Sequence, residues 1–376
     1  MLSIVIPTYN EGDNVARIAG RIREVLRDKP YEVVFVDDST DNTPELLSSL
    51  ARQDPHVVYR HRAGKRGLAT AVLRGFQVAE GDIIAVMDAD LQHPPEILVP
   101  MLWAIEQGAD IAIPSRFIPG GNDGGLSLKR KIVSATARYM GKALLRRLRN
   151  ITDVTSGYFM FRRRVIEGVN LKPIGWKILI EILVRGTYTR VVEIPYGFKA
   201  RSDGFSKMSV QEQLNYVRHL IGLVKDSPED RRFYCFALVG LSGVFVNMFV
   251  YYSLTLMGVE VRTAGTTSAL VAMTSNFILN DRITWYNARR GPIWLRSLRF
   301  FLVSSLGIVL NVEVLSLLYY HHQLNHLLAN FMGILAAVFW NFTMNNIWTW
   351  PSKTNSISVE RWPQELVIQY LVQENE

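Results

Sequence analysis

The chain has 376 residues, of which 48% are hydrophobic and 20% are charged, and its formal net charge is +8 at pH 7. This length allows two or three domains, and the charge predicts an anionic partner: a nucleic acid, a membrane surface or a phosphorylated substrate. The single cysteine, Cys235, excludes an intramolecular disulfide and a cysteine-based metal site.

The first part of the chain alternates predicted strands and helices. Apolar residues favour a strand within LSIVIPTYN, and helical spacing predicts a helix over Glu11–Leu26. A strand in YEVVFVDDSTDNT, a helix over 44–51, a short strand near 56–60, a helix over 67–79 and a strand in GDIIAVMDADLQHPP follow. This alternation predicts an α/β domain with a mainly parallel, doubly wound sheet. The initial apolar run is too short for a signal peptide, so we expect this domain to stay in the cytoplasm.

Carboxylates follow two of the predicted strands. Asp37 and Asp38 end the second strand, and Asp88 and Asp90 end the fourth. Ligands of such sheets bind at the carboxyl ends of the strands, so we expect these acids at one edge. A divalent metal with a polyphosphate is the natural counterpart of such a cluster. A D-x-D pair alone is common by chance and can be a solvated turn, but one that ends an apolar strand predicts a metal site.

Several segments resemble a known enzyme family. IPTYNE, VDDSTDNT, GKRGLATAVLRG and MDADLQHPPE resemble the nucleotide-binding half of the family 2 inverting glycosyltransferases. The segments SRFIPGG, LKRKIVS, DVTSGYFMFRRRVI and EIPYGFKARSDGFSK resemble one branch of it, the dolichyl-phosphate mannose synthases. The resemblance runs nearly without a gap through the first part of the chain. It implies a GT-A fold, which is Rossmann-like, and transfer of a sugar from a nucleotide donor.

The resemblance also implies a donor site and a metal site. It assigns Asp37 to the base or ribose, and it leaves Asp38 open between a donor contact and the cap of a helix. Oxygen ligands suit a hard cation, Mg²⁺ or Mn²⁺, which acts as a Lewis acid on the departing diphosphate. The implied nucleotide wall is Pro7, Tyr9 and Glu11; the metal ligands are Asp88, Asp90 and Gln92; and the clamps on the donor diphosphate are Arg201 and Lys207.

The acceptor poses a different chemical problem from the donor. A phosphate monoester is already ionised near neutral pH, so it can attack the anomeric carbon without a general base. Two anions must then approach each other, and cations must lie between or behind them. Arginine suits bidentate phosphate contact. The resemblance favours Arg116, Arg130 and Ser134 for the acceptor phosphate, within a basic group that also holds Lys129 and Lys131. The residues that we expect to carry catalysis are Asp90, Arg116 and Arg130.

Two basic amphipathic helices are predicted before the most apolar part of the chain. They cover about 128–150 and 207–225, and each aligns apolar side chains on one face. Helices of this kind beside a membrane domain are typical of the membrane interface. The alternative is that each helix packs on its own sheet.

Four apolar stretches long enough to span a bilayer come next: Phe233–Val259, Ala264–Trp285, Leu298–Tyr320 and His326–Trp350. Tryptophans near their ends argue against the alternative of buried helices in a soluble protein. The connection between the second and third stretches carries several arginines, whereas the other two connections carry almost no positive charge. The excess of positive charge on cytoplasmic loops then places both chain ends in the cytoplasm.

The apolar half repeats with an offset of about 65 residues, because NFILNDRITW (276–285) matches NFTMNNIWTW (341–350). This predicts two duplicated helical hairpins, which resemble the small four-helix membrane proteins that accompany bacterial lipid-linked sugar transferases. The repeated asparagines are costly in lipid and predict contacts between helices, with a transport or pore role as the alternative. The expected division is a catalytic domain over 1–228, a membrane domain over 229–352 and a tail over 353–376, whose role the sequence leaves open.

The expected activity is transfer of mannose from GDP-mannose to dolichyl (polyprenyl) phosphate, with inversion, by a multi-pass protein of the cell membrane. Membrane lipids are expected partners, a nucleic acid is not, and the oligomeric state is left open. The alternative enzyme is a polyprenyl-phosphate glucosyltransferase that uses UDP-glucose. A lipid or sugar flippase with a regulatory soluble half is a different class, and the intact Asp88, Asp90 and Gln92 argue against it.

Overall fold

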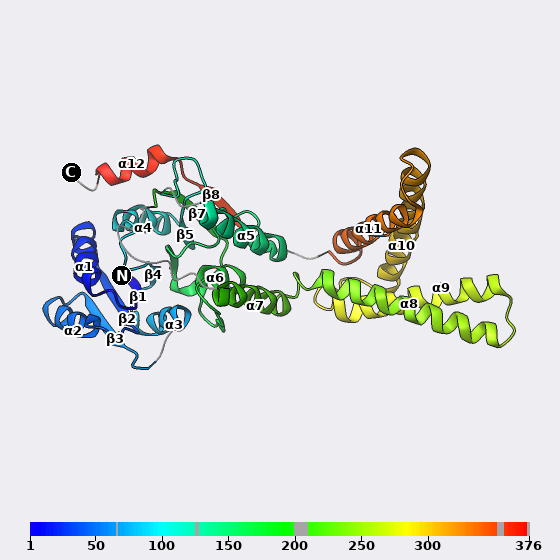
Figure 1. Ribbon diagram of the computed structural model, residues 1–376, viewed down its shortest axis with the longest axis horizontal. Helices are drawn as coiled ribbons and strands as arrows, with labels where there is room; N and C mark the ends of the chain where they lie inside the picture. Colours follow the sequence, from blue (N-terminus) through cyan, green and yellow to red (C-terminus); the bar gives the residue numbers. More distant parts are fainter. Residues whose placement is uncertain (65–66, 125–127, 199–209, 352–356, 374–376) are drawn as a thin grey trace. The chain divides into compact units, whose positions relative to one another are not determined.

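The computed structural model describes the chain except for residues 65–66, 125–127, 199–209, 352–356 and 374–376 (Figure 1). The chain forms two compact units. The first contains Met1–Val224 and Asn355–Glu376, and the second contains Lys225–Thr354. The first unit is an α/β domain, and the second consists of helices.

The first unit is built on an eight-stranded sheet in the order β3-β2-β1-β4-β6-β5-β7-β8. Every neighbouring pair is parallel except those of β6, which runs antiparallel to β4 and β5. The carboxyl ends of the parallel strands therefore share one edge with the start of β6. The strands are β1 (Leu2–Thr8), β2 (Tyr31–Asp37), β3 (Val57–His61), β4 (Ile83–Val86), β5 (Ile111–Ser115), β6 (Phe159–Arg162), β7 (Arg190–Pro195) and β8 (Ser358–Arg361).

Helices cover both faces of this sheet because successive strand residues point to opposite sides. In β1, for example, Ile4 and Ile6 join one core and Val5 joins the other. The first core is covered by α1 (Gly12–Val25), α2 (Thr43–Gln53), α4 (Leu98–Glu106) and α12 (Gln364–Gln373). The second is covered by α3 (Leu68–Val78), α5 (Leu128–Leu144), α6 (Ile178–Arg185) and α7 (Val210–Asp226). The expected GT-A type of sheet is confirmed.

The two expected amphipathic helices form, but with shorter bounds. Helix α5 ends at Leu144 and is followed by a 3-10 turn over Arg146–Leu148. Each helix has two apolar faces: Tyr216 and Leu220 of α7 pack into the core, while Leu214 and Ile221 are exposed. Packing on the sheet therefore leaves an apolar face on α7, and the interfacial role stays a prediction.

The expected separate tail is part of the first unit. Strand β8 pairs in parallel with β7, and α12 lies against α4. Trp362 and Tyr370 pack on Trp103 of α4, with ring centroids 4.5 and 3.8 Å from that of Trp103. The division into three segments was wrong at this point, because the apolar side chains around Val367 complete the core on one face of the sheet. The boundary between the units falls at 224 rather than 228.

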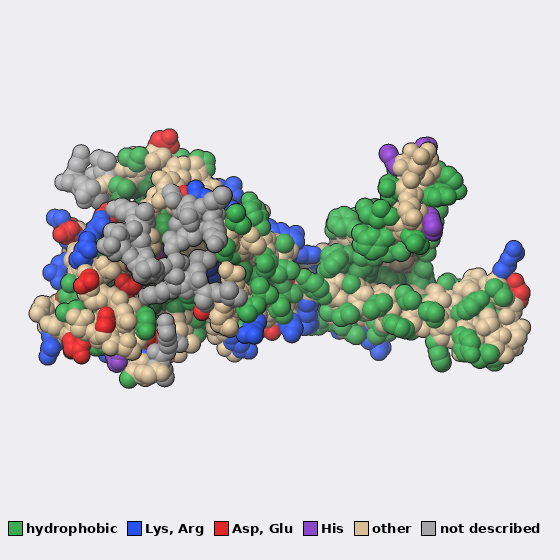
Figure 2. Space-filling view, in the orientation of Figure 1, with side chains coloured by type: hydrophobic (Ala, Val, Ile, Leu, Met, Phe, Trp, Pro, Cys, Tyr) green, Lys and Arg blue, Asp and Glu red, His purple; other side chains and the backbone are tan. Residues whose placement is uncertain are grey.

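The second unit contains two hairpins, in which α8 packs on α9 and α10 on α11. The helices are α8 (Arg232–Leu256), α9 (Val261–Leu279), α10 (Ile293–Ser316) and α11 (His326–Met344). One-turn π-helices follow three of them: η4 (Asn280–Thr284) after α9, η5 (Leu317–His321) after α10 and η6 (Asn345–Thr349) after α11. Figure 2 shows hydrophobic side chains along the exposed faces of these helices, and Phe249 of α8 is 73% exposed.

Three helices in the described part of the chain are long and apolar enough to cross a membrane: Arg232–Leu256, Ile293–His321 and His326–Thr349. Helix α9 forms where the second span was expected, but threonines, serines and Asn276 make it more polar than the others. A fourth span therefore stays a prediction.

The two hairpins meet through matching residues. Trp285 and Trp350 occupy equivalent places in the repeat and stack, with ring centroids 4.5 Å apart and an interplanar angle of 6°. The indole Nε1 of Trp350 donates to Asp281 Oδ1 (2.8 Å), and that of Trp285 donates to Asn346 Oδ1 (3.3 Å). Each indole thus donates a hydrogen bond to the other hairpin. The two acceptors, Asp281 and Asn346, also occupy equivalent places in the repeat.

The repeated asparagines lie against glycines of the neighbouring helix in the same hairpin. A Cβ added at Gly243 would lie 2.4 Å from Asn276 Oδ1, and one added at Gly307 would lie 2.6 Å from Asn341 Oδ1. Small residues permit such close approach between membrane helices. The expected contact between helices is therefore present, although Oδ1 of Asn276 and of Asn341 is buried without a hydrogen-bond partner among the described residues.

Candidate active site

Asp37 holds the ends of three strands together. Its carboxylate is fully buried at the end of β2. Oδ1 accepts hydrogen bonds from Thr8 Oγ1 (2.9 Å) and from the Ser39 hydroxyl, and Oδ2 lies 2.9 Å from His61 Nδ1. Both oxygens are thus engaged by side chains at the ends of β1 and β3 and by Ser39, which follows β2. The contact of Asp37 with a base or ribose stays a prediction, and the structure gives Asp37 a positioning role.

Asp38 forms a bidentate ion pair with Arg62. Arg62 Nε donates to Oδ1 (2.7 Å) and Nη2 donates to Oδ2 (2.5 Å), which also accepts from Gly67 N (3.0 Å). Asp38 does not cap α2, because Asp41 Oδ1 accepts from the backbone of Thr43 at the start of that helix, and a contact of Asp38 with the donor stays a prediction. Asp38 instead connects Arg62, which follows β3, to Gly67, which precedes α3.

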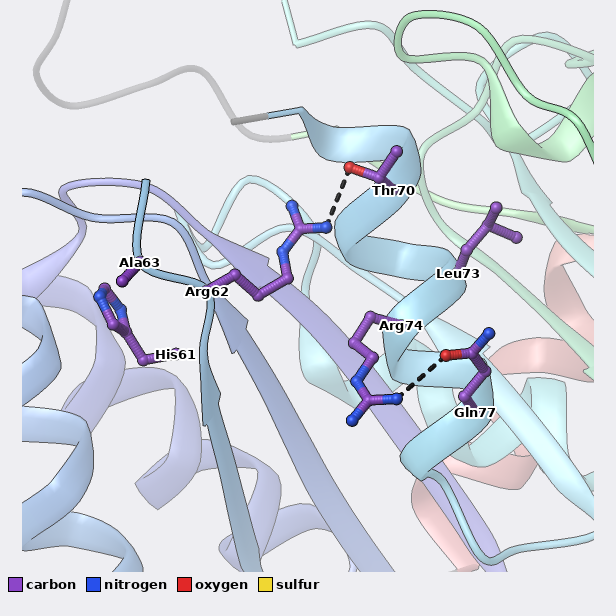
Figure 3. A pocket seen from close by; sticks show the side chains of 7 residues that line it. All are labelled: His61, Arg62, Ala63, Thr70, Leu73, Arg74 and Gln77. Atoms are coloured by element: carbon purple, nitrogen blue, oxygen red, sulfur yellow. Dashed lines mark hydrogen bonds between the residues drawn. The ribbon is translucent and has the colours of Figure 1, made fainter. Parts of the chain in front are cut away.

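An open pocket lies beside this ion pair, between the end of β3 and one side of α3 (Figure 3). Arg62 reaches across to the Thr70 hydroxyl (2.9 Å), and Arg74 donates to Gln77 Oε1 (3.1 Å). No expected metal ligand is among its described lining residues. They are His61, Arg62, Ala63, Thr70, Leu73, Arg74 and Gln77.

The expected metal ligands occupy a tight turn after β4. Leu91 adopts a positive φ of 57°, and Gln92 N donates to Asp90 Oδ1 (3.2 Å). The side chain of Asp88 is 43% exposed. Its backbone N–H donates to His93 Nδ1 (3.2 Å). The turn therefore presents Asp88 to solvent and keeps His93 buried behind it.

The chemistry of this turn fits a hard divalent cation. Two carboxylates and one amide carbonyl supply only oxygen ligands, and diphosphate oxygens would complete the coordination. Gly157 lies beside Asp88, and a Cβ added there would be in van der Waals contact with Asp88 Oδ2 at 3.4 Å. Among the residues that the structure describes, no group of three His, Cys, Asp or Glu could hold a metal, so Gln92 and the substrate would be required.

Arg116 follows β5 at the same edge and is held by Asp153. Its Nε donates to Asp153 Oδ2 (2.8 Å) and its Nη2 donates to Oδ1 (3.0 Å). Asp153 is fully buried. Burial lowers the pKa of Arg116, but the hydrogen bond and the charge of Asp153, with smaller contributions from Tyr196 and Asp123, raise it above the ordinary value. The guanidinium also lies over the Phe198 ring, 5.4 Å from its centroid. Nε and Nη2 of Arg116 are thus engaged within the protein. To bind a phosphate, Arg116 would have to use its remaining nitrogen, Nη1, or change its contact with Asp153.

The other expected basic residues lie on α5 or outside the described residues. Ser134 lies in the second turn of α5 and is half-buried. Arg130 lies in the first turn of this helix, and its side chain is outside what the structure describes. Arg201 and Lys207 fall in the undescribed segment 199–209. Neighbouring Lys131 pairs with Asp123 at 3.0 Å.

The expected nucleotide wall forms the turn after β1. Pro7 pairs with Val36 of β2. It lies beyond Val5, the last residue of β1 that pairs with β4. Tyr9 is half-buried. Glu11 precedes α1, and its backbone N–H donates to the Thr43 hydroxyl (3.1 Å). These residues line the same strand edge as Asp37.

The structure adds site residues that the sequence did not reveal. Asp153 and Thr155 lie in the segment before the antiparallel strand β6, which starts at the edge where the parallel strands end. Lys177 Nζ donates to Thr155 O (3.0 Å), and burial, with a smaller contribution from Arg116, lowers the pKa of this lysine. The Thr155 hydroxyl is buried and has no hydrogen-bond partner among the described residues. Asp153 and Thr155 lie in the segment DVTSGYF, which indicated the family in the sequence but did not predict the contacts with Arg116 and Lys177.

Comparison with known proteins covers both units. Residues 3–169 match the model of glycosyl transferase family 2, and residues 235–350 match that of the GtrA/DPMS transmembrane domain. A dolichol-phosphate mannosyltransferase of Pyrococcus furiosus is 39% identical over 350 residues, which are 93% of this chain and 99% of the relative. A polyprenol monophosphomannose synthase of Mycolicibacterium smegmatis is 38% identical over 216 residues, covering 55% of this chain and 80% of the relative.

Among solved structures, the chain is similar to glucosyl-3-phosphoglycerate synthase of Mycobacterium tuberculosis in complex with Mn²⁺, UDP and glucosyl-3-phosphoglycerate. The sequence identity is 19% and the TM-score is 0.44, with 60% of this chain and 78% of the other covered.

Proposed function

This chain belongs to the dolichol-phosphate mannosyltransferases of glycosyl transferase family 2 that carry a GtrA/DPMS transmembrane domain, and on this premise we propose that it transfers mannose from GDP-mannose to dolichyl phosphate. The observation that carries the proposal is the relative of nearly equal length, which matches both units along 93% of this chain. A polyprenol monophosphomannose synthase among the relatives supports mannose as the sugar and a polyprenyl phosphate as the acceptor class.

The reaction joins two anions. An oxygen of the acceptor phosphate forms a bond to the anomeric carbon of mannose, the bond from that carbon to the β-phosphate oxygen breaks, and its electron pair leaves with GDP. Attack from the face opposite the leaving group inverts the anomeric centre. The phosphate monoester supplies its own nucleophilic oxygen, so no side chain has to remove a proton.

The residues of the edge divide between the two substrates. The nucleotide would lie along the turn after β1, with Arg201 and Lys207 on its diphosphate. Asp88, Asp90 and Gln92 would hold Mg²⁺ or Mn²⁺, which stabilises the negative charge of the leaving diphosphate. Arg116, Arg130 and Ser134 would bind the acceptor phosphate, where the buried Asp153 keeps Arg116 charged and oriented.

The tail supports a location of both ends of the chain on the same side of the membrane. Strand β8 pairs with β7, so the segments before and after the second unit belong to one folded domain. They must then lie on the same side of the membrane, which requires an even number of crossings. Three spans would leave the two segments on opposite sides of the membrane, so we infer that α9 is a fourth span. The arginine-rich connection after α9 favours the cytoplasmic side.

The alternative donor is UDP-glucose. The experiment uses purified full-length protein, dolichyl phosphate and a panel of radiolabelled nucleotide sugars, with extraction of the lipid product. We expect labelled lipid from GDP-mannose and little from UDP-glucose. Efficient transfer from UDP-glucose would replace the proposal with a glucosyltransferase, and absence of any labelled lipid would exclude both.

A further inference from the structure

The tail that follows the membrane unit reaches toward the acceptor side of the site through Arg361. This residue ends β8, and its Nε lies 3.4 Å from Glu193 Oε2 on β7. Its Nη2 also donates to the Asn150 carbonyl (3.0 Å). The backbone N–H of Trp362 donates to the Glu193 carbonyl (3.0 Å), which continues the strand pairing beyond Arg361.

Glu193 connects this tail to the loop before β6. It is fully buried, and its second oxygen, Oε1, accepts three hydrogen bonds from that loop. The donors are the backbone N–H of Thr152 (2.7 Å), the hydroxyl of Thr152 (2.6 Å) and the backbone N–H of Asp153 (3.3 Å). One carboxylate therefore holds the tail with one oxygen and the loop with the other.

The loop in turn holds Arg116, because the Asp153 carboxylate binds its guanidinium at 2.8 and 3.0 Å. Thr152 adds a second tie to the same strand end, since its hydroxyl lies 2.6 Å from Ser115 Oγ. A continuous series of contacts thus runs from Arg361 through Glu193 and Asp153 to Arg116.

We propose that Arg361 is a positioning residue for the acceptor phosphate, through which the segment after the membrane unit orients Arg116. The proposal rests on the proposed role of Arg116 in binding that phosphate. A buried carboxylate needs cationic or N–H partners to remain oriented. Without Arg361, the Oε2 oxygen of Glu193 loses this donor, and only the bonds to Oε1 then hold the carboxylate, so we expect the two backbone N–H groups of the loop to be held less firmly.

Contacts other than those of Arg361 attach the tail to the first unit, so the positioning role of Arg361 can be tested separately from attachment of the tail. Trp362 and Tyr370 pack on Trp103 of α4 without involving Arg361, so the Arg361→Gln protein should keep its tail docked. Glu360→Gln is the matched control. Glu360 is the preceding residue of β8 and pairs with Arg190 (2.7 Å), which also joins β8 to β7 but does not touch Glu193.

The test compares full-length wild-type, Arg361→Gln, Arg361→Lys and Glu360→Gln proteins by amide hydrogen exchange and by kinetics. Exchange at Thr152 and Asp153 reports directly on the two bonds to Glu193. We expect faster exchange there in Arg361→Gln, together with an acceptor kcat/KM lowered about two- to fivefold, as suits a half-exposed ion pair. GDP-mannose affinity should stay at the wild-type value, Arg361→Lys should recover part of the loss, and Glu360→Gln should match the wild type.

Unchanged exchange and acceptor kinetics in Arg361→Gln would overturn the inference, as would an equal loss in Glu360→Gln or an equal loss of donor affinity. If wild-type protein forms no mannosyl lipid, the proposed function itself fails. If wild-type protein is active and Arg361→Gln behaves like Glu360→Gln, only the positioning role fails.

Discussion

Asp153→Asn should impair use of the lipid acceptor while leaving the donor site intact. The substitution keeps the size of the side chain but removes the charge that binds Arg116 through Nε and Nη2. Asparagine keeps one acceptor oxygen for this side-by-side contact and turns its NH2 group toward the other guanidinium nitrogen. Because Asp153 is fully buried, water cannot replace the lost partner. Hydrogen bonds to charged groups contribute about 1.5–3 kcal/mol, so acceptor kcat/KM should fall by about ten- to hundredfold.

The assay measures initial rates at varied dolichyl phosphate and saturating GDP-mannose, beside calorimetric titration of the donor. Arg116→Ala is the companion variant, and the double variant Asp153→Asn/Arg116→Ala should be little worse than Arg116→Ala alone, since both changes remove one interaction. Wild-type acceptor kinetics in Asp153→Asn would refute the reasoning. So would a loss of donor affinity as large as the loss in acceptor efficiency.

Three further predictions test other parts of the account. Asp90→Ala should abolish turnover without changing the melting temperature, because the turn after β4 lies at the sheet edge; activity that survives chelation of divalent metals in the wild type would contradict the metal site. Arg130→Ala should lower acceptor efficiency about ten- to hundredfold, whereas Arg201→Ala should weaken donor binding; equal damage to donor affinity in both variants would show that the cations are divided wrongly. Gly307→Val should lower the thermal stability of the membrane unit, because the new Cβ would lie 2.6 Å from Asn341 Oδ1, and an unchanged melting temperature in detergent would contradict this packing.

The parallel part of the sheet was predictable because each strand and helix leaves a local pattern. The apolar runs before Asp37 and Asp88 marked the strand ends, and the rule for ligand sites in parallel sheets then placed the acids at one edge. The duplicated hairpins were visible for a similar reason, since NFILNDRITW and NFTMNNIWTW occupy equivalent places in the repeat. The repeat shows that Trp285 and Trp350 are equivalent, but their stacking depends on how the two hairpins pack against each other.

The contacts that organise the basic side of the site could not be predicted in this way. Arg116 and Asp153 are 37 residues apart, and the start of β6 brings them together only because that strand runs antiparallel to its neighbours. Glu193 and Arg361 are 168 residues apart with the membrane unit between them. Strand β8 has four residues and no distinctive pattern, so its pairing depends on the edge that β7 offers.

The central claim is that the phosphate of a polyprenyl lipid displaces GDP from mannose with inversion. The most direct measurement is nuclear magnetic resonance of the lipid product made from GDP-mannose and dolichyl phosphate by the purified full-length protein. The account predicts mannose in β linkage to the lipid phosphate, with one GDP released for each lipid formed. An α-linked mannose, a sugar joined elsewhere than the phosphate, or release of GDP without a mannosyl lipid would contradict it.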